Sequence, residues 1–103
     1  LAALVRQLSD RVIDLSTLGV QNRVHAELLR LAQQAGVVDN RARLEPVPTH
    51  AELAGRISTN REQVTRELNA LRREGLLAKD GKALVVPDVA RLAGLVAEVR
   101  GFD

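Results

Sequence analysis

The sequence predicts a mainly α-helical fold with one small β-hairpin, and three features of the chain support this prediction. Two short amphipathic helix patterns flank the polar triplet Ser58-Thr59-Asn60. Further along, Asp80-Gly81 separates two short apolar runs, which is the strongest short-range indication of a hairpin. A seam of leucine and valine opens the chain. The 103 residues suffice for an ordinary hydrophobic core.

Composition excludes several classes of protein. The absence of cysteine rules out a disulfide framework, a thiolate nucleophile and a cysteine-ligated metal site. The two histidines, His25 and His50, lack acidic partners at ligand spacing, so we interpret them as solvated helix residues and expect no metal. No nucleophile–base arrangement or phosphate-binding glycine loop is present, and we expect no enzyme. No apolar run approaches the ~18 residues of a membrane span, so we expect a cytoplasmic protein without membrane contact.

The net charge is only +2, which argues against a polycation. All basic residues except Lys79 and Lys82 are arginine. Arginine suits bidentate recognition of phosphate and guanine, although a GC-rich genome produces the same bias without a functional reason.

Residues 1–18 predict a dimerisation helix. Apolar residues recur there at alternating spacings of four and three, with valine and leucine in the positions that favour two parallel strands of a coiled coil. The seam consists of Leu1, Val5, Leu8, Val12 and Leu15. Because two heptads are few for a coiled coil, packing of this helix on its own domain stays open as an alternative. The chain begins inside this pattern, so we expect a further N-terminal portion.

Residues 19–103 predict a second domain. A helix is expected from about Gly19 to Ala35, where Gly36 supplies a stop. Residues 37–48 predict a loop that contains a short edge strand at 43–47, since the prolines at 46 and 48 are tolerated only at a sheet edge.

Two capped helices come next. Thr49 and Glu52 form the pattern of a capping box, which starts a short helix that runs to about Ile57. Asn60 can cap a second helix that continues to residue 74. Strands are expected at 76–79 and 82–86 around Asp80-Gly81, and a last helix at 88–99.

Ala54, Ser58 and Val64 have the spacing of a helix-turn-helix. That unit needs a small residue where its helices cross, a small residue in the turn and a branched apolar anchor on the second helix. With a hairpin directly after it, the whole order describes a winged helix-turn-helix preceded by a long dimerisation helix, a fold that binds double-stranded DNA.

Arg61, Glu62 and Arg66 lie on the helical face opposite Val64 and Leu68, and we predict that they read bases. An arginine fork matches the O6 and N7 atoms of guanine, and a carboxylate accepts a hydrogen bond from cytosine N4. The alternative is a solvated Glu62–Arg66 pair at i, i+4 that only stabilises the helix.

The chain resembles the Crp/Fnr family of transcription regulators. The resemblance rests on the dimer helix, the Leu18-Gly19-Val20 junction, the stretch THAELAGRISTNREQVTRELNALRREGLL and the wing DGKALVV. It implies that a homodimer reads a TGTGA-like inverted repeat, with Arg61 and Arg66 on guanines and Glu62 on a cytosine. It also implies phosphate contacts from Thr49, Asn60 and Gln63. We predict two further phosphate contacts, from His50 at a helix start and from Lys82 in the wing.

The resemblance further implies a sensor domain, absent from this chain, that binds a cyclic nucleotide or another effector, and contact with RNA polymerase. No cofactor is expected in the chain itself. Two residues depart from the family pattern: Glu67 stands where an apolar residue is usual, and the acidic Asp80 lies at the wing tip, where Lys79 and Lys82 could offset it.

The main alternative function is a winged helix that serves as a protein-interaction or assembly module without specific DNA readout. A non-specific architectural DNA binder is a third possibility.

Overall fold

The computed structural model describes the backbone of residues 17–100 and the side chains of residues 19–98. The predicted dimer seam, Leu1, Val5, Leu8, Val12 and Leu15, lies outside these residues, so the dimerisation helix stays a prediction.

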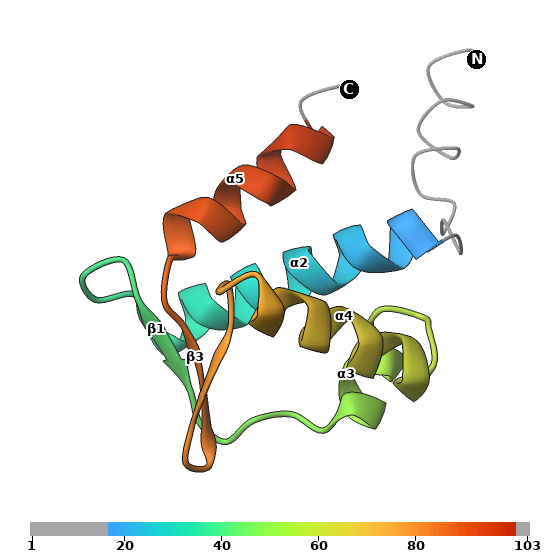
Figure 1. Ribbon diagram of the computed structural model, residues 1–103, viewed down its shortest axis with the longest axis horizontal. Coiled ribbons are helices and arrows are strands. Elements are labelled where there is room, and N and C mark those ends of the chain that lie inside the picture. Colours follow the sequence, from blue (N-terminus) through green and yellow to red (C-terminus); the bar gives the residue numbers. More distant parts are fainter. Residues whose placement is uncertain (1–16, 101–103) are drawn as a thin grey trace.

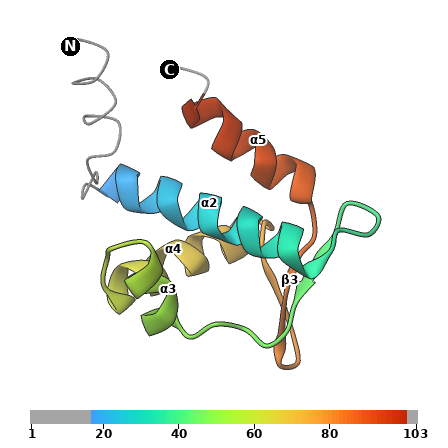
Figure 2. The ribbon, with the colours of Figure 1, turned by 180° about the vertical axis from the view of Figure 1, so that it is seen from behind.

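Helices and a small sheet alternate along the chain as the sequence predicts (Figure 1). The elements in order are α2 (Thr17–Ala35), β1 (Ala42–Leu44), α3 (His50–Arg56), α4 (Arg61–Arg73), β2 (Ala78–Asp80), β3 (Ala83–Val86) and α5 (Val89–Arg100). The helix α2 crosses the middle of the molecule, with α5 on one side and the α3–α4 pair on the other (Figure 2). The fold is therefore a winged helix-turn-helix, and the mainly α prediction is confirmed.

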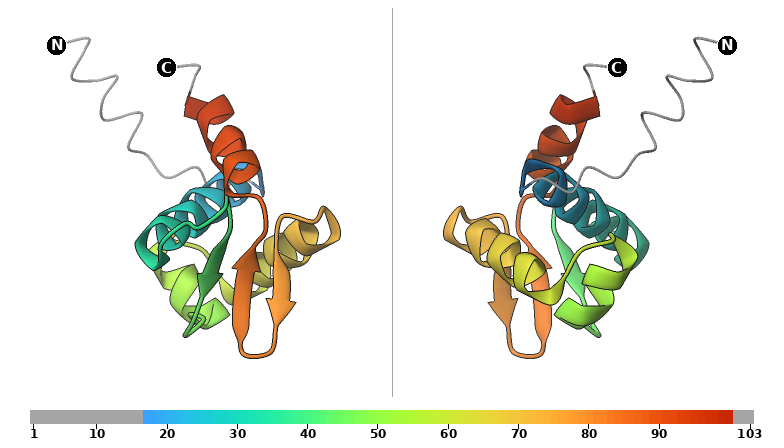
Figure 3. Two further views of the ribbon diagram at one scale, coloured as in Figure 1. Left: turned by 90° about the vertical axis from the view of Figure 1, so that its left-hand side faces the viewer. Right: turned by 90° about the vertical axis from the view of Figure 1, so that its right-hand side faces the viewer.

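The three strands form an antiparallel sheet in the order β1-β3-β2, so β1 is an edge strand as predicted. The β2–β3 hairpin, the wing of the fold, extends past the helices with its tip pointing away from α5 (Figure 3). The core lies around α2, which packs against α4, α5 and the inner face of the sheet, and α3 adds to it beside α4. Its most deeply buried large side chains are Val20, Leu28, Val64, Leu71, Leu76, Val86 and Leu92.

The strand bounds differ from the prediction in two places. The strand β1 spans Ala42–Leu44 rather than 43–47, because its ladder runs only from Ala42 opposite Val86 to Leu44 opposite Leu84, and Pro46 has no N–H to extend it. The strand β2 begins at residue 78 rather than 76, because Leu76 and Leu77 are buried in the connection that follows α4.

The wing turn is shifted by one residue from the predicted Asp80-Gly81. Asp80 pairs with Ala83, so the two-residue loop is Gly81-Lys82. Gly81 has a φ of 60°, as in a hairpin turn whose first central residue is glycine. The same glycine makes the turn, but Asp80 belongs to the strand and Lys82 to the tip.

Candidate nucleic-acid interface

The helix α4 has one face in the core and the opposite face in solvent. Its inner side chains are fixed in place, with Val64 0%, Leu71 2% and Leu68 6% exposed. Arg61, Glu62 and Arg66 are exposed, as their spacing predicts. The structure thus brings the three predicted base-reading residues together on the first half of one rigid helix.

The N-terminus of α4 is capped by Asn60. Its Oδ1 atom accepts a hydrogen bond from the Gln63 backbone N–H at 2.9 Å. The Thr59 hydroxyl donates to Gln63 Oε1 at 3.1 Å, which orients the side chain of Gln63 in the first turn. The backbone N–H groups of Arg61 and Glu62 have no partner within the helix, and they point outward at the positive end of its dipole. Such an end is suited to a phosphate.

The short helix α3 is capped by Thr49, whose Oγ1 accepts from the Glu52 backbone N–H at 3.0 Å. Only this half of the predicted capping box is formed, because the Glu52 carboxylate has no hydrogen bond within the described residues. His50 follows the cap and is half-buried. Its Nδ1 and the Thr65 hydroxyl share a hydrogen bond of 2.6 Å. The predicted phosphate contact His50 is therefore also a link between the two helices.

The turn between α3 and α4 is held from α2 by a contact that the sequence does not reveal. Arg23 Nε donates to the Ile57 carbonyl at 2.7 Å, which satisfies a carbonyl at the C-terminal end of α3. The two residues are 34 positions apart. Because nothing local in the sequence marks such a pair, only the tertiary structure identifies Arg23 as a positioning residue.

At the wing, Lys82 is exposed in the tip loop, and Asp80 lies beside it at the end of β2. The partner of Asp80 is Arg43 on β1, whose guanidinium reaches across β3 to the carboxylate. Arg43 also lies 3.3 Å from Glu45. The charge of Asp80 is thus offset by Arg43, rather than by Lys79 or Lys82 as the sequence suggested.

Among the side chains of residues 19–98, Glu67 and His25 are the two buried charged or polar ones, and each is 7% exposed. Burial raises the pKa of the Glu67 carboxyl, whereas nearby Arg66 lowers it and Glu74 raises it further. Because His25 is buried, the expectation that both histidines are solvated is wrong for His25, and this burial lowers the pKa of its imidazole. The α-helical period carries His25 inward beside Val24.

Within residues 17–100, no group of three histidine, cysteine, aspartate or glutamate side chains could hold a metal ion. In the same part of the chain, every helix is too short or too polar to cross a membrane.

The chain is similar in sequence to known helix-turn-helix proteins. The model of the Crp-like helix-turn-helix domain family matches residues 22–95. A CRP-like cAMP-activated global transcriptional regulator of Mycobacterium tuberculosis is 32% identical over 94 residues, which cover 90% of this chain and 42% of that protein. The chain thus spans less than half the length of the curated relatives it matches.

The chain is also similar in structure to parts of solved proteins. The catabolite activator protein of Thermus thermophilus is 30% identical, with a TM-score of 0.63 over 95% of this chain and 45% of that one. Reduced CprK without ligand has a TM-score of 0.69 over 91% of this chain and 44% of that one, and at 18% identity it shows the fold alone.

Proposed function

Because the chain belongs to the Crp-like helix-turn-helix family, we propose that it is the sequence-specific DNA-binding part of a Crp/Fnr-type transcription regulator. One observation carries this proposal: Arg61, Glu62 and Arg66 are exposed on α4 while its opposite face is buried. A helix held in this way can enter the major groove without giving up its core contacts.

The chemistry of the three side chains favours a TGTGA-like half-site. Arg61 and Arg66 each offer a planar fork to the O6 and N7 atoms of a guanine, and Glu62 accepts from the N4 amino group of a cytosine. In this proposal Thr49, His50, Asn60, Gln63 and Lys82 hold phosphates and so fix the register of the domain on the duplex.

We further propose that two copies bind one inverted repeat. A two-fold pair would place two α4 helices in successive major grooves, about 34–36 Å apart. The heptad seam of residues 1–18 supplies the contact between the copies in this proposal.

Substitution of Arg61 tests the function. Arg61→Ala is expected to weaken binding to a TGTGA-like duplex by about 1–3 kcal/mol and to relax preference at one base pair. Arg41→Ala is a matched control, because it removes the same charge from an exposed residue in the connection between α2 and β1, outside the helix-turn-helix. It should leave base preference unchanged.

The interaction-module alternative predicts different results. Such a module would show equal, weak DNA binding for both variants, without the steep fall of affinity with salt that phosphate contacts cause. Equal affinity for specific and scrambled duplexes would instead favour an architectural binder.

A further inference from the structure

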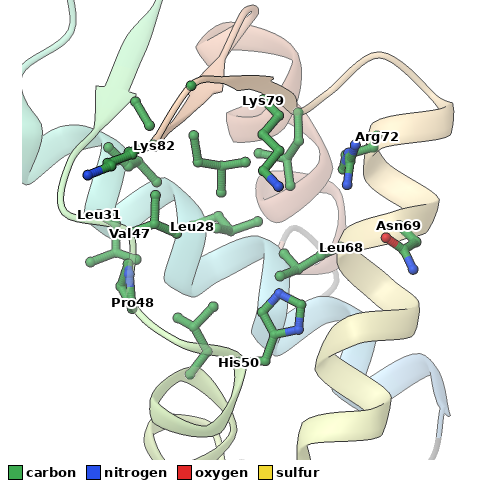
Figure 4. Close-up of a pocket in the computed structure, with 16 residues that line it drawn as sticks. Leu28, Leu31, Val47, Pro48, His50, Leu68, Asn69, Arg72, Lys79 and Lys82 are labelled. Atoms are coloured by element: carbon green, nitrogen blue, oxygen red, sulfur yellow. The ribbon is translucent and has the colours of Figure 1, made fainter.

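A cavity of about 510 Å³ lies between the wing and the helices α2, α3 and α4. Its size is within the roughly 300–1,000 Å³ range of small-molecule sites. The floor is apolar and consists mainly of leucine side chains: Leu28, Leu31, Leu44, Leu53, Leu68 and Leu84. Figure 4 shows three of them, Leu28, Leu31 and Leu68, around the same hollow.

The rim of the cavity is cationic. Arg72 from the last turn of α4, Lys79 from β2 and Lys82 from the wing tip line it, and no lining residue is acidic. Figure 4 shows Arg72 and Lys79 approaching from the helix and from the hairpin, and the two residues also line a neighbouring hollow together. The wing carboxylate Asp80 is paired with Arg43 and does not line the cavity.

The three rim cations form no ion pair within residues 19–98. A purely apolar molecule would cover the leucine floor, but the three cationic side chains would then hydrogen-bond only to water. A small anion alone would bind the cationic side chains but would leave the leucine floor exposed to water. The combination fits a molecule that has an apolar body and one terminal anionic group, because that group can accept charge-assisted hydrogen bonds at the rim.

From this match of shape and charge we propose that the cavity binds a small amphipathic anion, namely a carboxylate on an apolar chain or ring. The apolar part lies on the leucine floor, and the carboxylate lies between Arg72 and Lys79. This site is separate from the exposed face of Arg61, Glu62 and Arg66, none of which lines the cavity.

Binding of a ligand in the cavity is expected to weaken DNA binding, an effect that rests on the proposed function. His50 and Lys82, two of the predicted phosphate contacts, also line the cavity. A bound carboxylate between Arg72 and Lys79 would place a negative charge near these two residues and would repel the phosphates that they are proposed to hold, so it would lower DNA affinity without touching the base-reading side chains.

The test uses octanoate and octan-1-ol, which share the same chain and differ in charge. Each is titrated into the ¹⁵N-labelled chain without DNA, and amide shifts are followed by NMR. Octanoate should shift amides of β2, β3 and the second half of α4, and should bind about fivefold more tightly than octan-1-ol. The double variant Arg72→Ala/Lys79→Ala should lose this preference, whereas Arg41→Ala should retain it.

The proposal is overturned by equal affinity for the acid and the alcohol, by shifts outside the cavity, or by an unchanged preference in the double variant. Filling the floor with Leu31→Phe should weaken both ligands together, and unchanged binding of both would also contradict the site. Since no DNA is present, failure here leaves the proposed DNA-binding function standing, and failure of DNA binding leaves this site standing.

Discussion

His50 Nδ1 lies 2.6 Å from Thr65 Oγ1, so the first residue of α3 is hydrogen-bonded to the middle of α4. Together with the Arg23–Ile57 contact, this bond fixes the angle at which α4 projects from the domain. The geometry of the exposed Arg61–Arg66 face therefore depends on side chains that do not belong to it.

Thr65→Val should show how much the link between the helices contributes. The substitution keeps the branched shape but removes the hydroxyl, and it leaves a half-buried imidazole nitrogen without its partner. We expect the free energy of unfolding in urea to fall by about 0.5–1.5 kcal/mol. Thr65→Ser retains the hydroxyl and should lose less. Equal stability of the valine variant and the wild type would show that the bond contributes nothing.

Asn60 combines a structural role with a proposed DNA contact, and two substitutions separate them. Asn60→Ala removes the cap of α4 and should lower the free energy of unfolding by about 1 kcal/mol. Asn60→Asp keeps the cap and should keep the stability, but its carboxylate would repel a phosphate at this helix end. Duplex binding by fluorescence anisotropy should therefore weaken in the aspartate variant. Undiminished binding would place the phosphates elsewhere.

Ser58 has the conformation of a helix-ending glycine. Its φ is 59°, and the next residue, Thr59, donates from its N–H to the Ala54 carbonyl at 2.9 Å. Gly75 ends α4 in the same way, with a φ of 79° and a 2.9 Å bond from Leu76 to Leu71.

Because a side chain strains this conformation, Ser58→Gly should raise the free energy of unfolding by about 0.5–1 kcal/mol, and Ser58→Val should lower it. Thermal and urea unfolding measure both changes. A loss of stability in the glycine variant would show that the serine side chain makes a compensating contact.

Glu67 is buried with a raised pKa, and its removal should stabilise the domain. Glu67→Leu replaces a carboxylate that has no hydrogen bond within the described residues, and it should raise the free energy of unfolding at neutral pH by about 1–2 kcal/mol. The family pattern, which has an apolar residue here, agrees with this direction.

The destabilising effect of the buried Glu67 carboxylate on the folded domain should decrease as the pH falls. Its pKa in the folded state lies above the ordinary value of 4.5, so the folded state binds more protons between these two pKa values. The cost of burying the carboxylate is present in full above the folded pKa and disappears as the pH falls towards 4.5. The stability advantage of Glu67→Gln should therefore be larger at neutral pH than near pH 4.5. An advantage that grew in acid would contradict the cause assigned to the shift.

The parts of the fold that depend on local signals could be predicted from the sequence. Thr49 and Asn60 cap helices because their side chains reach amides three residues on, and that relation is visible in the chain. The pair Arg43–Asp80 and the contact Arg23–Ile57 could not be predicted, since they join residues 37 and 34 positions apart. The wing register was misplaced by one residue because Asp80-Gly81 and Gly81-Lys82 are both plausible two-residue turns around one glycine.

The central claim is that Arg61, Glu62 and Arg66 read bases, and selection from a random duplex pool tests it most directly. Repeated selection on the wild-type chain should enrich a TGTGA-like inverted repeat. The Arg61→Ala chain should enrich the same motif with one position relaxed. Enrichment of no motif, or of one motif unchanged by the substitution, would contradict the account.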